Sequence, residues 1–244
     1  MNWYEALTHQ DMHVHSTFSD GKNTIEENIA QAEHMGLRAL RCVDHVRADT
    51  KWVPTFTATV RALAARAEVG LSCAVEAKLL DTQGRLDTPL DLGDIDAIYA
   101  ADHQVPLADG PHPPSEIRAK LDNGEMAVED VLEAIVAATE MALRRPEHVV
   151  IAHLFSVLPK IGLSEQDVQP KAIERLAGSA AKHGASIEID ERWRCPSAQT
   201  LRPFVHHGVP LLLSTDSHRS ETIGRYDYCT RVLRELCHDY PVTL

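Results

Sequence analysis

The segment 11–15 carries two histidines, His13 and His15, in the arrangement His-x-His. Side chains alternate between the two faces of a strand, so histidines separated by one residue lie on the same face and can bind one cation. The turn-rich residues 16–21 can bring the carboxylate of Asp20 back toward the same point. Two histidines in a strand are also common as ordinary polar residues, so this motif indicates a metal site only together with other ligands.

Further histidines and acidic residues occur at or near the ends of other expected strands. They are His45, Glu76, His103, His153, Asp216 and His218. One such histidine alone is more often a satisfied interior residue than a ligand. Because the carboxyl ends of parallel strands meet at one face of a barrel, we expect all these side chains to surround a common point. Imidazoles and carboxylates in this number favour a site for divalent metal ions.

Strand and helix patterns alternate along the chain. Short apolar segments predict strands at residues 11–15, 37–43, 71–80, 95–101, 149–152, 185–190 and 209–215. A capping box of Thr24 and Glu27 begins the first expected helix, which ends at Gly36. An alanine-rich helix is expected to end near Gly70, and later helices are expected at 127–143, 172–182, 197–207 and 228–238. The alternation predicts an α/β fold whose parallel sheet closes into a barrel.

Residues 104–123 are the least regular part of the sequence. Prolines and glycine recur there, namely Pro106, Gly110, Pro111, Pro113 and Pro114. Proline disfavours both helix interiors and central strands, so we predict a long loop without secondary structure. It leaves the end of a strand that carries a candidate ligand, so it is either a rim or lid over the site or a stiff surface loop.

Length and composition favour one globular domain spanning residues 1–244. A chain of 244 residues with 44% hydrophobic residues can bury a large core, and α/β barrels of this size commonly form one domain. We find no run of about 18 apolar residues that would span a membrane, and no signal-peptide pattern at the start. The five cysteines include no C-x-x-C pair, which favours reduced, structural thiols. These features predict a cytoplasmic protein.

The formal net charge of −12 argues against a general nucleic-acid surface, because polyanions are repelled at long range. Small molecules are the better candidates for a binding partner. The oligomeric state is left open by these features.

As a set, the motifs resemble the PHP (polymerase and histidinol phosphatase) family. The matching segments span nearly the whole chain in order: His13-Val14-His15, Ser19-Asp20-Gly21, Asp44-His45, Val75-Glu76, Asp102-His103, Ala152-His153, Ile187-Glu188-Ile189-Asp190 and Asp216-Ser217-His218. The resemblance implies a distorted (β/α)7 TIM-like barrel that holds two or three divalent ions of zinc, manganese or iron and hydrolyses phosphate esters.

The resemblance also implies a ligand set. His13, His15, Glu76 and Asp216 would bind one metal ion, and Glu76 would bridge to a second ion that His103 and His153 also bind. The third ion would be bound by Asp20, His45 and His218. Many family members have histidine where this chain has Asp20 and serine where it has Ala101, and the first difference bears on the identity and occupancy of the third metal. Glu188 matches a position that we expect to be structural, next to the ligands.

The expected chemistry is attack on phosphorus by a metal-activated water. Two adjacent metal ions lower the pKa of a bridging water and neutralise the phosphoryl oxygens, which assigns catalytic roles to Glu76, Asp216 and His218. Arg192, Arg194 and Lys160 follow expected strands and are candidates for binding the phosphate, although each one alone is somewhat more often a solvated surface residue.

Two further side chains near this chemistry have alternative roles. His112 is either a leaving-group acid or an exposed imidazole, and we favour exposure. Trp193 lies between two of the arginines in sequence and is a candidate wall of the substrate pocket.

The predicted function is a metal-dependent phosphoesterase, phosphatase or phosphodiesterase, that acts on a small phosphorylated metabolite. One alternative is histidinol-phosphate phosphatase specifically. Another is metal-dependent amide hydrolysis, which uses the same activated water and would be favoured if Arg192 and Arg194 pointed away from the metals. The non-enzymatic alternative is a metal-binding accessory module.

Overall fold

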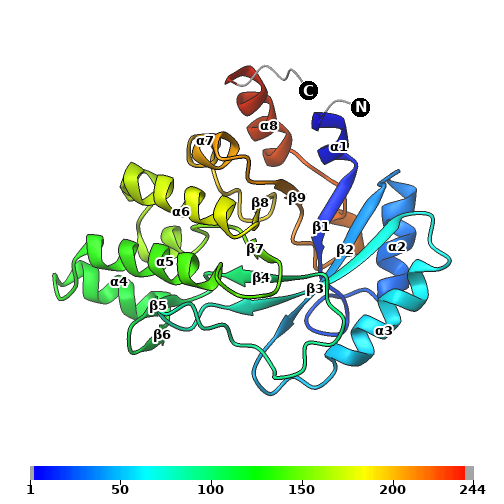
Figure 1. Cartoon of the computed structure of the whole chain (residues 1–244), viewed down its shortest axis with the longest axis horizontal. Coiled ribbons are helices and arrows are strands. Elements are labelled where there is room, and N and C mark those ends of the chain that lie inside the picture. The colour runs from blue at the N-terminus through cyan, green and yellow to red at the C-terminus, as the bar shows by residue number, and fades with distance from the viewer. Residues whose placement is uncertain (1–2, 240–244) are drawn as a thin grey trace.

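Seven parallel strands form one sheet in the computed structural model, which describes residues 3–239. The strands follow chain order around the sheet (Figure 1): β1 (Gln10–Val14), β2 (Ala39–Val46), β3 (Gly70–Lys78), β4 (Ala97–Ala101), β7 (Val149–Ile151), β8 (Ser186–Asp190) and β9 (Leu211–Ser214). Between β9 and β1, the His15 N–H donates to the Ser217 carbonyl at 2.8 Å and Val14 pairs with Ser217 in an isolated bridge. The sheet is therefore a nearly closed, distorted (β/α)7 barrel, which confirms the predicted fold class.

Helices surround this sheet (Figure 1). The α-helices are α1 (Trp3–Thr8), α2 (Ile25–His34), α3 (Val53–Ala64), α4 (Pro114–Asp122), α5 (Val128–Ala142), α6 (Pro170–Lys182), α7 (Ala198–His206) and α8 (Tyr228–Asp239). Short 3-10 helices are η1 (Leu158–Ile161), η2 (Glu165–Asp167) and η3 (Ser220–Thr222). The predicted capping box is present, because the Glu27 N–H donates to Thr24 Oγ1 while the Glu27 carboxylate accepts the Thr24 N–H. None of the helices within residues 3–239 is long and apolar enough to cross a lipid bilayer.

The two faces of the strands bury different residues. On β4, Ile98 and Ala100 belong to the large core that also includes buried residues of α5 and α6. The alternate residues Ala97, Tyr99 and Ala101 form a separate inner cluster with small residues of β2, β3 and β7. Successive side chains of a strand point to opposite faces, and both faces of this strand are buried.

Tyr99 fills the barrel interior next to the first histidine. Its hydroxyl donates to the carbonyl of Met12, and its ring lies edge-on to His13 with centroids 4.7 Å apart. The packed interior therefore supports the side chain of His13 from within the barrel.

The prediction that residues 104–123 lack secondary structure was wrong. Strands β5 (Val105–Leu107) and β6 (Gly110–His112) form an antiparallel hairpin, and α4 follows directly. Pro106 and Pro111 face each other in a two-stranded ribbon. Both strands are edge strands, which tolerate proline because its missing N–H breaks no hydrogen bond of a central sheet. Pro114 occupies the first turn of α4, where its missing N–H costs nothing.

The same segment packs firmly on the barrel. Val105 and Ile117 are fully buried and belong to the same core cluster as Ile135 of α5. Residues 104–123 are therefore a fixed part of the wall, next to His103 at the end of β4, and the lid interpretation loses its support.

Candidate metal centre

All nine candidate ligands lie at the carboxyl ends of the strands or in the loops directly after them. His13 lies on β1, His45 on β2 and Glu76 on β3, whereas the others follow the ends of β1, β4, β7 and β9, namely His15, Asp20, His103, His153, Asp216 and His218. Parallel strands present their carboxyl ends at one mouth of the barrel, so residues separated by about 200 positions meet there.

Glu76 lies at the centre of this group. Its Oε1 lies 2.9 Å from Nε2 of both His103 and His153. Its Oε2 lies 2.9 Å from His45 Nδ1, and His13 Nε2 and His15 Nε2 are 3.3 and 3.5 Å away. Burial raises the pKa of Glu76, but the surrounding imidazoles, His103 first, outweigh it and hold the pKa well below its usual range. The site therefore keeps this carboxylate ionised.

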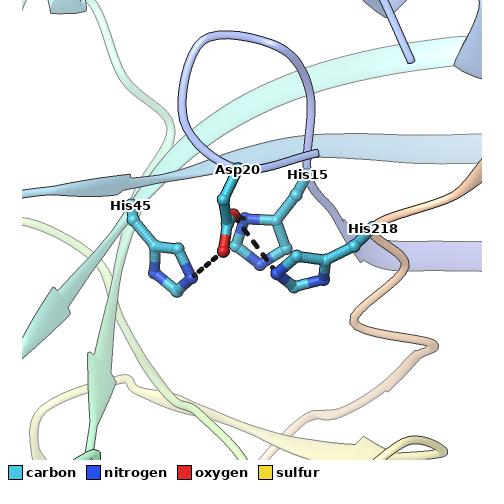
Figure 2. Close-up of side chains that lie close together, drawn as sticks. All are labelled: His15, Asp20, His45 and His218. Carbon is cyan, nitrogen blue, oxygen red and sulfur yellow. Dashed lines mark ion pairs between the residues drawn. The ribbon is translucent and has the colours of Figure 1, made fainter. Parts of the chain in front are cut away.

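Asp20 stands in the middle of a second group. Figure 2 shows its carboxylate between the imidazoles of His15, His45 and His218. Asp20 Oδ1 lies 3.2 Å from His218 Nε2 and 3.8 Å from His15 Nδ1, and Oδ2 lies 3.7 Å from His45 Nε2. One potential ligand atom from each of the four residues lies within 4.8 Å of the others. The carboxylate at this position thus faces three imidazole nitrogens, as a ligand would.

A third group consists of His13, His15 and Asp216, all buried. His15 Nε2 lies 3.0 Å from Asp216 Oδ1. Asp216 has a φ of +47° and His153 has a φ of +26°, which is the left-handed region that side chains other than glycine seldom adopt. Strained backbone at two candidate ligands is typical of functional sites, where the surrounding structure holds it in place.

The buried ligand atoms have few partners of their own. Within the described residues, atoms without a hydrogen bond include His13 Nε2, both ring nitrogens of His15, Glu76 Oε2, His153 Nδ1 and Asp216 Oδ1. Buried polar atoms are nearly always hydrogen-bonded, because an unpaired one costs about 1–3 kcal/mol. Nitrogen and carboxylate donors that converge without partners are what divalent cations such as zinc require, so the residues fit such ions.

Four further carboxylates hold the ligands in position. Glu188 Oε1 lies 2.8 Å from His13 Nδ1, which directs the other ring nitrogen of His13 toward Glu76, and Glu188 Oε2 accepts the His153 N–H at 2.9 Å. This position agrees with the structural role expected for Glu188. The other three, Asp11, Asp44 and Asp102, accept hydrogen bonds from hydroxyls of the neighbouring loops.

The anchoring roles of two of these aspartates, Asp44 and Asp102, were missed from the sequence. Ser16 and Ser19 donate to Asp44, and Ser156 donates to Asp102. The repeated pair Asp-His, with the carboxylate one residue before the ligand, was the available signal. An adjacent residue in an extended segment points to the opposite face, where it can bind the loop rather than the metal.

Basic side chains line the cavity over this centre, which has a volume of about 730 Å³. Arg192 Nη1 lies 3.3 Å from Asp216 Oδ2 and 2.6 Å from His218 Nδ1. Lys160 lies 4.0 Å from the centre of the Trp193 ring, and burial lowers its pKa. Trp193 Nε1 donates to Asp216 Oδ2 at 2.8 Å, so this tryptophan forms part of the cavity wall and also holds a candidate ligand.

Arg194 does not join Arg192 in this cavity, so the structure does not bring together the two arginines that were both candidates for binding the phosphate. Its guanidinium lies 6.0 Å from the centre of the Tyr228 ring, and it lines a different cavity of about 610 Å³. A φ of +55° at Arg194 turns the chain just after Trp193. The sequence pattern contains no sign of this turn, because left-handed conformation is uncommon for arginine.

Two basic cavity residues were missed from the sequence. Arg47 and Lys78 also line the cavity of about 730 Å³, where β2 and β3 end. His112, for which exposure was favoured over a leaving-group role, is held between the surface carboxylates of Asp109 and Glu116, at 2.9 Å from each, with its side chain 18% exposed. His112 is not among the residues that line the cavity.

Comparisons with known proteins agree with this geometry. The family model described as the PHP domain matches residues 11–190. A protein of Clostridium botulinum named a probable phosphatase is 24% identical over 237 residues, covering 93% of this chain and 85% of that protein. A protein of Edwardsiella ictaluri with the same description is 26% identical over 244 residues, with the same two coverages.

Among solved structures, the histidinol phosphate phosphatase of Lactococcus lactis, in complex with zinc, L-histidinol and phosphate, superposes with a TM-score of 0.67. The match covers 94% of this chain and 92% of that one at 15% identity, so it supports the shared fold. The family model spans well over half of the chain, and the residues that carried the resemblance converge at one mouth of the barrel. The chain therefore belongs to the PHP domain family.

Proposed function

We propose that this protein is a metal-dependent phosphoesterase that acts on a small phosphorylated molecule. The observation that carries the proposal is the set of buried nitrogen and carboxylate atoms without hydrogen bonds around Glu76, with Arg192 and Lys160 lining the same cavity. The names of the relatives, both probable phosphatases, support the same activity.

The proposed ligand sets follow the carboxyl ends of the strands. His13, His15, Glu76 and Asp216 would hold one ion, with Glu76 shared by a second ion that His103 and His153 also bind. Asp20, His45 and His218 would hold a third, with His15 close enough to contribute. Bound divalent ions supply an activated water and neutralise charge on the phosphoryl group.

The residues of the chain have separate tasks in this proposal. Arg192 carries a permanent positive charge and a planar fork of donors that matches two phosphoryl oxygens. Lys160 stands beside it as a second cation, and the Trp193 ring limits where its ammonium can lie. The Trp193 N–H occupies Asp216 Oδ2, which leaves Asp216 Oδ1 directed at His15 and the metal position. In this proposal, positive charge lies where negative charge develops on the phosphoryl oxygens during transfer.

Amide hydrolysis by the same centre is the competing reaction. It would be favoured if the cavity had no cation for a phosphoryl group, and Arg194 does point elsewhere. Arg192 and Lys160 line the cavity, however, and both are placed to receive an anion. This position supports the phosphoesterase.

A phosphate-release assay tests the proposal. The protein is loaded with zinc or manganese, the bound metal is measured, and a panel of phosphate monoesters and diesters, histidinol phosphate among them, is incubated with it. We expect release from at least one ester and none from the chelated protein. Failure to release phosphate from every ester, with metal bound, would refute the proposed function.

A further inference from the structure

The cavity over the candidate metal centre is larger than a phosphoryl group requires. Its volume is about 730 Å³, within the range of about 300–1,000 Å³ that is typical of small-molecule sites. Four basic residues line it: Arg47, Lys78, Lys160 and Arg192. Four carboxylates, Asp20, Glu76, Asp87 and Asp216, line the same cavity, and all except Asp87 are candidate metal ligands. Bound divalent ions would neutralise those ligands, so the four basic residues would then attract anions to the cavity.

The four residues form two pairs on opposite sides of the barrel. Arg47 directly follows β2 and Lys78 ends β3, and these strands are neighbours in the sheet. Lys160 and Arg192 come after β7 and β8, which are also neighbours. In the barrel order, β4 separates the two pairs on one side, and β9 and β1 separate them on the other. The candidate ligands on or after β1, β4 and β9 therefore lie between the pairs.

One of the pairs includes an arginine that contacts candidate metal ligands directly. Arg192 contacts Asp216 and His218, so the pair Lys160 and Arg192 is the one proposed above for the phosphoryl group. A ligand held there extends across the metal centre toward the strands β2 and β3. The far pair is then left for the other end of the same molecule.

In the far pair, the protein framework holds the Lys78 side chain and the backbone of Arg47, and Arg47 itself is exposed. Asp87 Oδ2 lies 3.8 Å from Lys78 Nζ, and Asp87 Oδ1 accepts the Ala48 N–H at 2.9 Å. The Arg47 N–H donates to Thr50 Oγ1 at 2.9 Å, which orders the turn after β2. Among residues 3–239, no carboxylate forms an ion pair with the Arg47 guanidinium. Two cations thus face one carboxylate, and positive charge remains for a ligand.

We infer that the substrate carries a second anionic group, a carboxylate or a second phosphate, which Arg47 and Lys78 bind while its phosphate ester lies at Lys160 and Arg192. This inference rests on the proposed function. The same charge disfavours a leaving group with an ammonium, because like charges brought together repel each other. Selectivity in this chain is therefore set at the ends of β2 and β3.

Four esters that differ mainly in the charge of the leaving group test the inference on the manganese-loaded protein. They are glycerol phosphate, which is otherwise neutral, 3-phosphoglycerate with a carboxylate, propanediol bisphosphate with a second phosphate, and phosphoethanolamine with an ammonium. We expect kcat/KM to be about tenfold or more higher for one or both two-anion esters than for glycerol phosphate, and lowest for phosphoethanolamine. The ratio between the two favoured esters tells carboxylate from phosphate.

Two variants locate the second anion subsite. Arg47→Gln and Lys78→Met should each raise KM for the favoured ester about tenfold, and leave the kinetics of glycerol phosphate within about twofold. Arg85→Gln is the matched control, because Arg85 is an exposed arginine that pairs with Asp81 and does not line the cavity. Equal losses for all esters, or no preference among them, would overturn the inference.

Calorimetric binding of the same esters separates this inference from the proposed function. If the two-anion esters bind more tightly, and Arg47→Gln removes the difference, the second anion subsite stands even when no ester is hydrolysed. Hydrolysis of several esters with no difference in binding gives the opposite result, in which the phosphoesterase stands and the subsite is rejected.

Discussion

Glu76 is the residue on which the candidate centre depends. One buried carboxylate faces five imidazoles, each within 3.5 Å, while several of the ring nitrogens around it have no hydrogen bond. A set of unpaired buried donors is costly to fold and becomes favourable once cations bind. The same nitrogen and carboxylate atoms would therefore bind the cations and, once the cations are bound, stabilise the fold.

Replacing Glu76 with glutamine should remove the shared negative charge and keep the shape of the side chain. We expect loss of at least one bound ion and of nearly all turnover, with an unchanged circular dichroism spectrum, because the ions depend on that charge. Metal analysis after dialysis measures the first effect. Glu140→Gln, at a surface pair with Arg175, is the control. Wild-type metal content and turnover in Glu76→Gln would show that Glu76 is not a ligand.

The two arginines that flank Trp193 should behave differently. Arg192→Ala should lower kcat/KM for a phosphate ester by about 100-fold while metal content is kept, because a charge-assisted contact strengthens in the transition state. Arg194→Ala should stay within about twofold of wild type, since its guanidinium lies near Tyr228. Steady-state kinetics with parallel metal analysis checks both variants. Similar losses in the two variants would contradict this division of roles.

Asp20 should influence which metal the third site prefers. A carboxylate is a harder donor than an imidazole, so the wild-type site should accept manganese or iron more readily, relative to zinc, than Asp20→His does. Dialysis against equal concentrations of zinc and manganese, followed by metal analysis, measures the ratio. Asp49→His, on the exposed turn after β2, is a control for an added histidine. An unchanged ratio would mean that Asp20 only shapes the turn before Gly21.

At the level of elements, every strand of the barrel except β8 delivers a candidate ligand, and contacts between neighbouring loops fix several of these ligands. Asp44 on β2 binds Ser16 and Ser19 of the loop that carries Asp20, so the second strand holds the loop of the first. Asp102 after β4 binds Ser156 after β7 in the same way. The loops at the mouth are thus joined to one another, and the ligand positions follow from the barrel rather than from any one segment.

The packing of α4 leads to a prediction about stability. Ile117→Ala should lower the free energy of unfolding by about 2–5 kcal/mol, because Ile117 is fully buried in the main core. Activity per folded molecule should change little. Leu90→Ala, at a fully exposed leucine, is the matched control. Urea denaturation measures the change, and a loss below about 1 kcal/mol would instead indicate that residues 104–123 behave as a mobile lid.

Over the whole molecule, the barrel concentrates opposite charges at one mouth. The chain is strongly acidic, yet four cations surround a cavity whose floor contains Glu76 and Asp216. Divalent ions would neutralise the floor and add to the attraction for phosphate. The mouth then becomes a positive region on a negative protein, which favours small anionic ligands over cationic ones.

Metal removal should destabilise the whole fold. Each site filled at 100 times its dissociation constant stabilises the folded state by about 2.7 kcal/mol, so chelation should lower Tm by roughly 5–10 °C for each site that it empties in a barrel of this size. Differential scanning calorimetry with and without zinc measures the shift. The Glu76→Gln variant should show a smaller shift. Equal Tm values for the chelated and zinc-loaded wild type would contradict the presence of these sites.

Much of this architecture could be predicted from the printed residues. The alternation of short apolar segments with helical spacing reveals seven strands, and a parallel order then brings residues as distant as His13 and His218 to one mouth. The capping box of α2 was also predictable. These features depend on local periodicity and on general rules of barrel topology, both of which are present in the linear sequence.

The sequence could not show which basic side chains face the mouth of the barrel. Arg192 and Arg194 are two residues apart, yet a left-handed φ at Arg194 sends one to the cavity and the other to Tyr228. Arg47 and Lys78 belong to no sequence motif, and only the positions of β2 and β3 in the barrel bring them to the same cavity as Lys160. The direction of a loop side chain depends on single dihedral angles and on contacts with distant segments, and neither has a periodic signal.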